Sequence, residues 1–280
     1  MRQLILDKMP DKKGIVRVEG SDFKYLRQVL RVKSGDMINL RLPDGSLQNS
    51  TVAAVDDKSK KILLQICAGA LTSTDVSAGN GILPRGNPAR GTVTRGVQAD
   101  EIQSELSSCG QEYILFQFIP KPQKFEQIVR QATECGVKTI VPVIGEYSEK
   151  SSVLALQGNK RDRLEKIIRE ARQQSGSPVE TVVTEAMTLG EALGRYERDV
   201  AFVLYERQVD EGASTSELLK TNPQAKKIGI ACGCEGGISP DEIELLTKKG
   251  LFIPLHFSVN ILRCETAALY GIAAVQVARS

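Results

Sequence analysis

The sequence has few of the residues from which metal centres are built. It contains a single histidine, His256, and six cysteines scattered over the chain. Cys232 and Cys234 stand two positions apart, whereas a zinc-chelating hairpin prefers a spacing of three, and a tetrahedral site needs four well-placed soft ligands. We therefore expect no metal site, and we expect the cysteines to be small buried hydrophobes.

The sequence also lacks a secretory signal, a twin-arginine start and any long apolar span. Together with the scattered cysteines, these absences predict a cytoplasmic protein with reduced thiols and no membrane contact. Lys and Arg total 37 against 34 Asp and Glu, so the net charge of +3 says little about partners by itself. Apolar material is plentiful: 41% of the 280 residues are hydrophobic, which supports a full core in a chain long enough for two domains.

Residues 1–66 consist of short extended runs separated by turn signals such as Pro43-Asp44-Gly45. This pattern predicts a small β-barrel or sandwich. A helix interrupts it in SDFKYLRQVLRV, where Lys24, Arg27 and Arg31 are spaced as on one helix face, away from the apolar face. Three exposed cations suit a phosphate backbone, although a solvated surface helix explains the same pattern without function.

Residues 67–110 contain seven glycines, two prolines and three Arg-Gly pairs, with almost no bulky apolar side chains. Such a segment cannot offset its ordering entropy by burial. We predict a flexible insertion or linker. Its Arg-Gly pairs could contact phosphates, or it could be a plain insertion.

Residues 111–280 alternate strand-like and helix-like patterns. Apolar runs such as YILFQFI and TIVPVI are followed by segments with apolar residues on one helical face, and Thr188 with Glu191 forms a capping-box signature. This alternation predicts an α/β domain with a mainly parallel sheet that is covered on both faces.

The most informative stretch is KKIGIACGCEGGISPDEIELL, residues 226–246. It predicts a strand, a glycine loop and a helix with Ser239 as N-cap, Pro240 at the first helical position and Glu242 closing a capping box. The glycines allow close approach of backbone to a ligand, although a tight connecting turn is the simpler interpretation. The spacing G-x-x-G-G, late in the chain and without an acidic ribose-binding partner, argues against a dinucleotide-dependent oxidoreductase.

A polar group follows in LFIPLHFSVNILRCETAALYGIAAVQVA, residues 251–278. Asn260, Arg263, Glu265 and Thr266 separate an apolar strand from a helix rich in small residues. Charged groups between apolar elements are costly unless they are paired or used, so an Arg263–Glu265 structural ion pair and a functional site are both open. The small residues would serve a dimer interface or an unusually tight internal crossing.

Two motifs in these stretches resemble those of a known family. GCEGGISPDE and FSVNILRCETA are similar to G-P-E-G-G-[FIL]-[ST]-x-x-E and L-G-x-R-I-L-R-x-E-T-A, the last two motifs of bacterial small-subunit ribosomal RNA uridine N3-methyltransferases, which belong to the knotted SPOUT class. Weaker matches in LRQVLRVKSGD, ATECGV and EARQQS extend the resemblance to most of the chain outside 67–110.

The resemblance implies a domain plan, a cofactor and partners. It implies a PUA-like RNA-binding barrel at 1–66, an insertion at 67–110 and a SPOUT α/β domain with a trefoil knot at 111–280. Knots are rare exceptions, so periodicity alone could not predict one. The family binds S-adenosylmethionine in the knot loops, mainly through backbone groups, and works on small-subunit ribosomal RNA as a homodimer through the knot region.

The type and spacing of two residues suggest catalytic roles. Arg263 would stabilise the deprotonated uridine, and Glu265 would orient Arg263 or accept a proton through water. The resemblance implies the binding residues. The cofactor-binding positions are Gly233, Glu235, Gly236, Gly237, Leu255, Phe257, Ser258, Ile261, Leu262 and Thr266, and the RNA-binding positions are Arg2, Lys24, Arg27, Arg31 and Lys121.

The sequence departs from the family pattern at five positions. Cys234 replaces a proline, Ser258 a glycine, Asn260 an arginine, Gln131 a lysine and Tyr147 an arginine. These losses keep open a second function, a non-catalytic RNA-binding ribosome-assembly factor that retains the fold. With no tryptophan and 5% aromatic residues, we expect few stacking platforms for an unstacked base.

Overall fold

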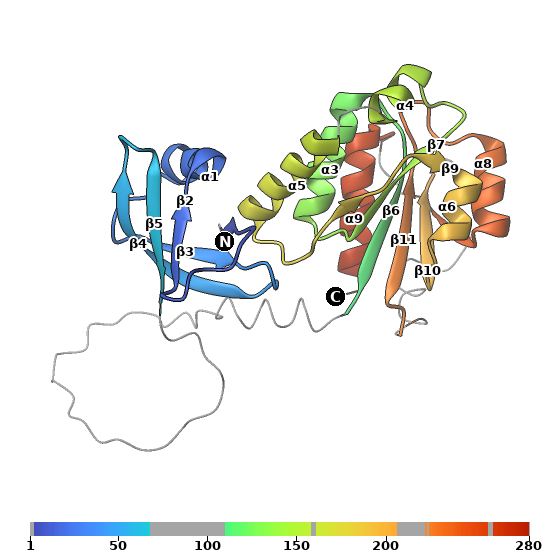
Figure 1. Cartoon of the computed structure of the whole chain (residues 1–280). Helices are drawn as coiled ribbons and strands as arrows, with labels where there is room; N and C mark the ends of the chain where they lie inside the picture. Colours follow the sequence, from blue (N-terminus) through green and yellow to red (C-terminus); the bar gives the residue numbers. More distant parts are fainter. Residues whose placement is uncertain are drawn as a thin grey trace, which may run out of the picture. The chain divides into compact units, whose positions relative to one another are not determined.

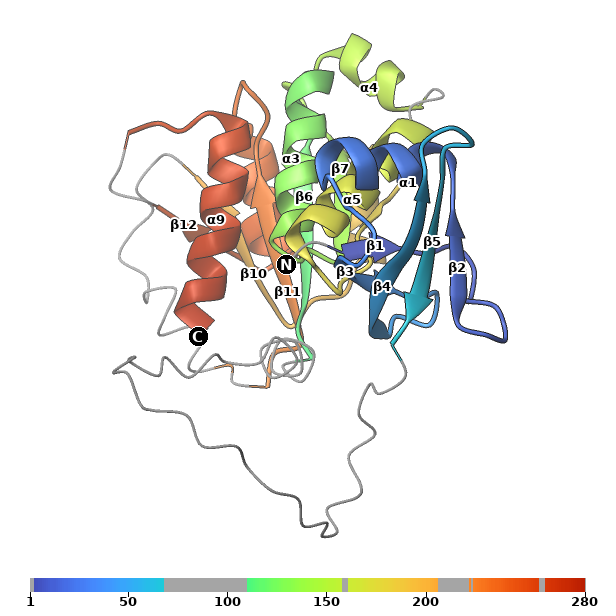
Figure 2. The same ribbon diagram turned by 90° about the vertical axis from the view of Figure 1, so that its left-hand side faces the viewer.

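A computed structural model describes residues 3–67, 110–157, 161–205, 222, 224–256 and 260–279. The chain divides into two compact units, one of Leu4–Ser108 and one of Cys109–Ser280 with Met1–Gln3. Figures 1 and 2 show each unit from two directions. Three predicted site residues, Arg2, Phe257 and Ser258, lie outside the described residues, as does the predicted insertion apart from its two ends.

The N-terminal unit contains one five-stranded sheet in the order β1-β3-β4-β5-β2. The pairs β3–β4, β4–β5 and β5–β2 are antiparallel, and side chains such as Leu40, Ile62 and Leu64 form its buried core. Within the described residues the strands form a single sheet, which argues against a sandwich of two sheets. The strands are β1 (Gln3–Ile5), β2 (Ile15–Val18), β3 (Met37–Arg41), β4 (Leu47–Asp56) and β5 (Lys61–Ile66).

The helix of this unit ends earlier than its sequence pattern indicates. Helix α1 (Gly20–Lys24) continues as a π-helical turn, η1 (Tyr25–Val29), and Arg31 adopts a left-handed backbone with φ of 56°. This turn carries the chain back to the sheet, where Val32 is buried and its N–H donates to the carbonyl of Leu26. The prediction that Arg31 shares a helix face with Lys24 is therefore wrong.

The C-terminal unit contains a seven-stranded sheet in the order β12-β10-β11-β6-β7-β8, with β9 also paired to β7. Its strand pairs are parallel, which confirms the prediction from the apolar runs. The strands are β6 (Glu112–Phe118), β7 (Thr139–Ile144), β8 (Val182–Val183), β9 (Met187–Thr188), β10 (Val200–Leu204), β11 (Lys227–Cys232) and β12 (Phe252–Leu255).

Helices cover both faces of this sheet, as predicted (Figure 1). One core packs under α3 (Pro122–Glu134), α5 (Arg161–Ser175) and α9 (Cys264–Arg279). The other packs under α6 (Leu189–Arg195) and under α8 (Pro240–Glu244), which continues as the π-helical turn η2 (Leu245–Lys249). A further helix, α4 (Lys150–Gln157), follows β7. No helix in the described ranges is long and apolar enough to cross a membrane.

Helix α9 packs very closely on the sheet. A methyl group at Gly271 would lie 2.5 Å from Cδ1 of Leu204, the last residue of β10. Gln276 also donates a hydrogen bond of 2.7 Å to the carbonyl of Cys135, which ties α9 to the end of α3. Gly271 therefore serves a tight internal crossing of α9 on the sheet.

Candidate active site

A cavity of about 420 Å³ lies at the carboxyl ends of β10, β11 and β12. Ligands of parallel α/β sheets bind outside these strand ends, and small-molecule pockets span about 300–1,000 Å³. The cavity collects residues from both sequence motifs. Its lining consists of Lys124, Leu204, Tyr205, Cys232, Gly233, Cys234, Glu235, Gly236, Gly237, Ile238, Leu255, His256, Asn260, Ile261, Leu262, Arg263, Cys264 and Ala267.

The glycine loop after β11 is a tight turn that forms one wall of this cavity. The N–H of Gly237 donates to the carbonyl of Cys234 over 3.0 Å, and Gly237 has a positive φ of 82°. A methyl group at Gly233 would lie 2.7 Å from the backbone carbonyl carbon of Gly237. The two ends of the loop touch through backbone, and only glycine at position 233 permits that contact.

Gly236 is required for a different reason, because Tyr147 packs against it. A methyl group at Gly236 would lie 2.7 Å from Cβ of Tyr147, which follows β7. The aromatic side chain of Tyr147 therefore contacts the loop at a position where the resemblance led us to expect an arginine.

The helix that follows the loop begins as the sequence predicts. Ser239 and Glu242 exchange both hydrogen bonds of a capping box, and Pro240 occupies the first helical position. The second oxygen of Glu242 accepts the N–H of Glu146 over 2.7 Å. The capping residue therefore also fixes the chain between β7 and Tyr147.

Gln117 fixes the start of the loop from the neighbouring strand β6. Its side chain is fully buried, and its Nε2 donates to the carbonyls of Cys232 (3.2 Å) and Gly233 (3.0 Å). Among the described residues its Oε1 has no hydrogen-bond partner. The sheet thus holds the loop at its first residue by side-chain donors.

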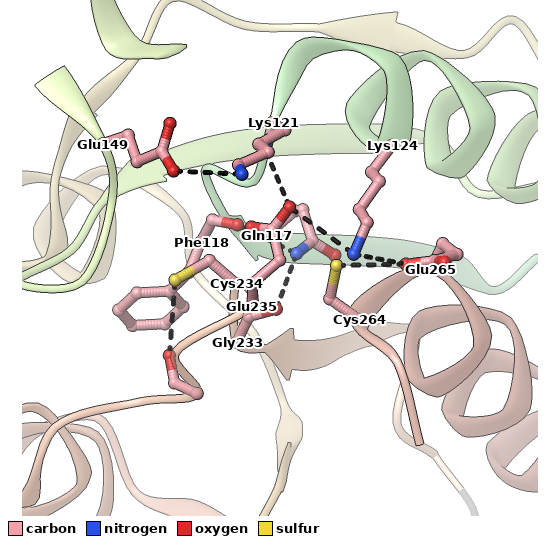
Figure 3. A network of polar contacts seen from close by, with 11 residues as sticks. Gln117, Phe118, Lys121, Lys124, Glu149, Gly233, Cys234, Glu235, Cys264 and Glu265 are labelled. Atoms are coloured by element: carbon pink, nitrogen blue, oxygen red, sulfur yellow. Dashed lines mark hydrogen bonds and ion pairs between the residues drawn. The ribbon is translucent and has the colours of Figure 1, made fainter. Parts of the chain in front are cut away.

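A charged cluster lies beside the loop, as Figure 3 shows. Nζ of Lys124 is 3.6 Å from Oε1 of Glu235 and 3.5 Å from Oε2 of Glu265. The backbone N–H of Lys121 donates to Oε1 of Glu235 over 3.2 Å, and the thiol of Cys264 contacts Oε2 of Glu265 at 3.3 Å. One ammonium therefore faces two carboxylates from two separate chain segments.

The environment fixes the protonation states of this cluster. Burial raises the pKa of Glu265, but the backbone N–H of that residue, the Cys264 thiol and Lys124 outweigh it, so the pKa is lowered and the carboxylate stays ionised. Desolvation and the hydrogen bond with Glu265 raise the pKa of Cys264 to about 12, so it stays a thiol. Desolvation lowers the pKa of Lys124, but the electrostatic effects of Cys264, Glu265 and Glu235 together raise it.

Arg263 lines the cavity but does not pair with Glu265. Arg263 is the residue before α9, and its side chain is exposed. Its backbone carbonyl accepts hydrogen bonds from the N–H groups of Thr266 and Ala267. Glu265 lies in the first turn of α9, where its carboxylate faces Lys124. The alternative of an Arg263–Glu265 ion pair is therefore wrong, because among the described residues the carboxylate of Glu265 pairs with Lys124 and not with Arg263.

The remaining predicted site residues are placed as follows. Thr266 is exposed on α9, outside the cavity lining, and Phe257 and Ser258 lie outside the described residues. Sequence reasoning missed Lys124, because a lysine in the first turn of a helix is an ordinary context that does not indicate its distant partners. The predicted cofactor-binding residues that line the cavity are Gly233, Glu235, Gly236, Gly237, Leu255, Ile261 and Leu262.

The predicted RNA-binding residues differ in whether their side chains are paired within the protein. Lys24 and Arg31 are exposed, whereas Arg27 binds both oxygens of Asp57, at 2.8 and 2.7 Å, and donates to the carbonyl of Val32. The hydrogen bond with Asp57 raises the pKa of Arg27. Lys121 belongs to the C-terminal unit, where its ammonium is 3.4 Å from Glu149. Arg27 is therefore engaged in contacts within its own unit.

Within the part of the chain that the structure describes, no three His, Cys, Asp or Glu side chains are grouped as a metal site would require.

Comparisons with known proteins agree with this geometry. Residues 108–276 match the sequence profile of the family described as RNA methyltransferase domain. Ribosomal RNA small subunit methyltransferase E of Bacillus subtilis is 30% identical over 164 residues, which are 56% of this chain and 62% of that protein. Ribosomal RNA small subunit methyltransferase E 2 of Borreliella burgdorferi is 23% identical over 98% of this chain and 96% of its own.

A solved structure shows the same fold over nearly the whole chain. It is a ribosomal RNA small subunit methyltransferase E from Neisseria gonorrhoeae bound to S-adenosyl methionine, with 19% identity and a TM-score of 0.65 over 99% of this chain and 97% of that one. The family profile covers more than half of the sequence and includes the strands, the glycine loop and the start of α9 that form the cavity. The chain therefore belongs to the RNA methyltransferase domain family.

Proposed function

We propose that this protein transfers a methyl group from S-adenosylmethionine to N3 of a uridine in small-subunit ribosomal RNA, in the cytoplasm. The observation that carries the proposal is the cavity at the ends of β10, β11 and β12, where the glycine loop and the segment before α9 meet. These are the two segments that resemble the motifs of the uridine N3-methyltransferases. The names of the relatives, with their reference to small-subunit ribosomal RNA, support the choice of substrate.

The residues around the cavity fit this cofactor. The loop offers backbone groups with no side chain at Gly233, Gly236 and Gly237, and the opposite wall offers apolar side chains such as Leu255 and Leu262. The charged groups at the cavity balance, since Glu235 and Glu265 stand against Lys124 and Arg263, so a single sulfonium adds no large electrostatic cost. S-adenosylmethionine supplies an electrophilic methyl group on a sulfonium.

The protein takes little covalent part in such a displacement, so the rate acceleration comes mainly from positioning and electrostatic stabilisation. Arg263 lines the cavity with an exposed guanidinium, which would stabilise the uridine anion after N3 gives its proton to solvent. N3 would then take the methyl group, and S-adenosylhomocysteine would leave. Glu265 is better suited to positioning than to proton transfer, because its pKa is lowered and its carboxylate is bound to Lys124. The thiols of Cys232 and Cys264 have raised pKa values, so neither supplies a thiolate nucleophile.

The proposal includes the family's architecture. The antiparallel sheet of the N-terminal unit is compatible with a PUA-like barrel, and the return of the chain from β12 to α9, on the face opposite α8, is compatible with a trefoil knot. A homodimer through this region would cover the exposed side chains of Ile261, Tyr270 and Val277.

The proposal is tested by mass spectrometry of ribosomal RNA from cells with and without the gene. We expect one methylated uridine of the small-subunit RNA to disappear in its absence. Calorimetry with the purified protein separates the alternative function, because an assembly factor that has lost catalysis would leave the modification pattern unchanged and is expected to bind no S-adenosylmethionine.

The free cations of the N-terminal unit are expected to contact RNA phosphates. Changing Lys24 and Arg31 together to Ala should weaken RNA binding and flatten the slope of log affinity against log salt by about 1.4, because each lost contact with a single strand removes about 0.7. Titrations at several salt concentrations measure both. An unchanged slope would remove these residues from the RNA surface.

Arg27→Ala is expected to act on folding, since Arg27 binds Asp57 and the carbonyl of Val32. Its melting temperature should fall, and Arg27→Lys, which keeps the charge but not the two-point contact, should not restore it. A variant with unaltered melting and weakened RNA binding would reverse this assignment and return Arg27 to the phosphate-binding residues.

A further inference from the structure

Lys124 connects the two chain segments that enclose the cavity. It lies in the first turn of α3 and is itself part of the cavity lining. Its ammonium contacts Glu235 of the glycine loop and Glu265 of the first turn of α9 (Figure 3). These segments meet at the cavity although they are far apart in the sequence, and the same side chain contacts both.

The carboxylates of Glu235 and Glu265 each make a second contact besides the ion pair with Lys124. Oε1 of Glu235 also accepts the backbone N–H of Lys121 at the start of α3, and Glu265 also contacts the thiol of Cys264. The side chain of Glu265 is only 12% exposed and that of Lys124 is 29% exposed, so the pair is weakly screened by water. Removing the ammonium would leave two carboxylates beside the cavity without the cation that they share, held by the N–H of Lys121 and the thiol of Cys264.

We propose that Lys124 is the positioning residue of the cofactor site: its ammonium holds the glycine loop and the start of α9 at the separation that the cofactor requires. This inference rests on the proposed function, because it names the residue that prepares the same cavity. Lys124 takes no part in the displacement. Through Glu235 it positions the backbone groups of the loop. Through Glu265 it positions Arg263, which lies two residues earlier in the sequence.

The central experiment compares Lys124→Met with the unaltered protein by calorimetry. Met keeps most of the length of the side chain and removes the charge. The affinity for S-adenosylmethionine is expected to fall on the order of tenfold. Interaction energies between residues of one charged network are of the size that corresponds to such a change in affinity. The affinity for S-adenosylhomocysteine, which lacks the sulfonium charge, should fall by the same factor, because a displaced wall affects both ligands. Lys124→Arg should recover most of the loss.

A second variant separates repulsion from loss of packing. If the two carboxylates push the walls apart in Lys124→Met, then adding Glu265→Gln to it should raise the affinity again, although Glu265→Gln alone should lower it. A double variant as weak as the sum of the single losses would overturn the proposed cause.

A third measurement needs no cofactor. Amide hydrogen exchange over residues 233–238 in the cofactor-free protein should be faster in Lys124→Met, because the loop has lost its link to α9. The matched control is Lys248→Met, which removes a lysine whose ion pair with Glu244 is shorter, at 2.6 Å, but exposed and away from the cavity lining. This control should change neither loop exchange nor cofactor affinity.

The outcomes distinguish this inference from the proposed function. If the unaltered protein fails to bind S-adenosylmethionine, the proposed function falls and this inference falls with it. If the unaltered protein binds and Lys124→Met binds equally well with unchanged loop exchange, only the role of Lys124 is overturned. A fall in affinity that follows the melting temperature, and that Lys124→Arg does not recover, would reduce Lys124 to a structural residue.

Discussion

Arg263→Ala is expected to slow methylation about a hundredfold while the protein stays folded and keeps its affinity for S-adenosylmethionine. The side chain of Arg263 lines the cavity and is exposed, so its guanidinium is available to the substrate. In the transition state the uridine carries a negative charge that the ground state lacks, and loss of one donor to such an anion costs about a hundredfold or more. Single-turnover rates with saturating cofactor measure this effect directly.

The same variant tests the pairing of Glu265. Had Glu265 been paired with Arg263 in a buried position, removal of the arginine would have cost roughly 3–5 kcal/mol of stability. The carboxylate is bound to Lys124 instead, so the melting temperature of Arg263→Ala should stay close to that of the unaltered protein. A folded variant that methylates at the original single-turnover rate would remove Arg263 from the mechanism, and a large fall in melting temperature would restore the structural explanation.

Much of the C-terminal unit could be predicted because its signals are local. Strands buried on both faces are mostly apolar, so β6 and β7 can be recognised in the sequence as nearly continuous apolar runs. The capping boxes at Thr188 and Ser239 are formed by residues three positions apart and are present as predicted. The order of the strands could not be derived in this way, because the pairing of β10 with both β11 and β12 depends on contacts between distant segments.

The N-terminal helix shows where periodicity fails. Lys24, Arg27 and Arg31 have regular spacing in the sequence, but the spacing predicts a shared face only if the helix is regular. The π-helical turn and the left-handed Arg31 break that condition, because Val32 has to reach the core. Asp57, which binds Arg27, lies beyond β4 and carries no sequence signal that connects it to the helix.

The candidate site divides in the same manner. The glycine loop and Arg263 could be predicted from the sequence because they belong to contiguous motifs, and the structure places them at one cavity. Lys124 and Gln117 could not be predicted in this way, because the partners of each lie more than a hundred residues away along the chain. A residue whose importance depends on tertiary contacts has an ordinary sequence context, and only the fold reveals it.

Gly233→Ala is expected to weaken the binding of S-adenosylmethionine by about tenfold to a hundredfold, which makes it a strong test of the loop. The added methyl group would lie 2.7 Å from the carbonyl carbon and 2.8 Å from the carbonyl oxygen of Gly237. Both obstacles are backbone atoms, so no side-chain rotation relieves the contact and the loop has to open. Overpacking of this kind costs about 1–3 kcal/mol, and each 1.4 kcal/mol corresponds to tenfold in affinity.

The matched control is Gly194→Ala, in which the same methyl group is added to a glycine of α6 that has no neighbouring atom within 4 Å. Since Ala favours a helix over Gly by about 1 kcal/mol, this control should keep or raise the melting temperature and leave cofactor affinity unchanged. The same strain destabilises the folded protein, so the melting temperature of Gly233→Ala should fall by about 2–4 °C for each 1 kcal/mol, and affinity is measured well below that temperature. Its affinity then reports on the loop itself, and a value equal to that of the control would mean that the cofactor binds elsewhere than against Gly233–Gly237.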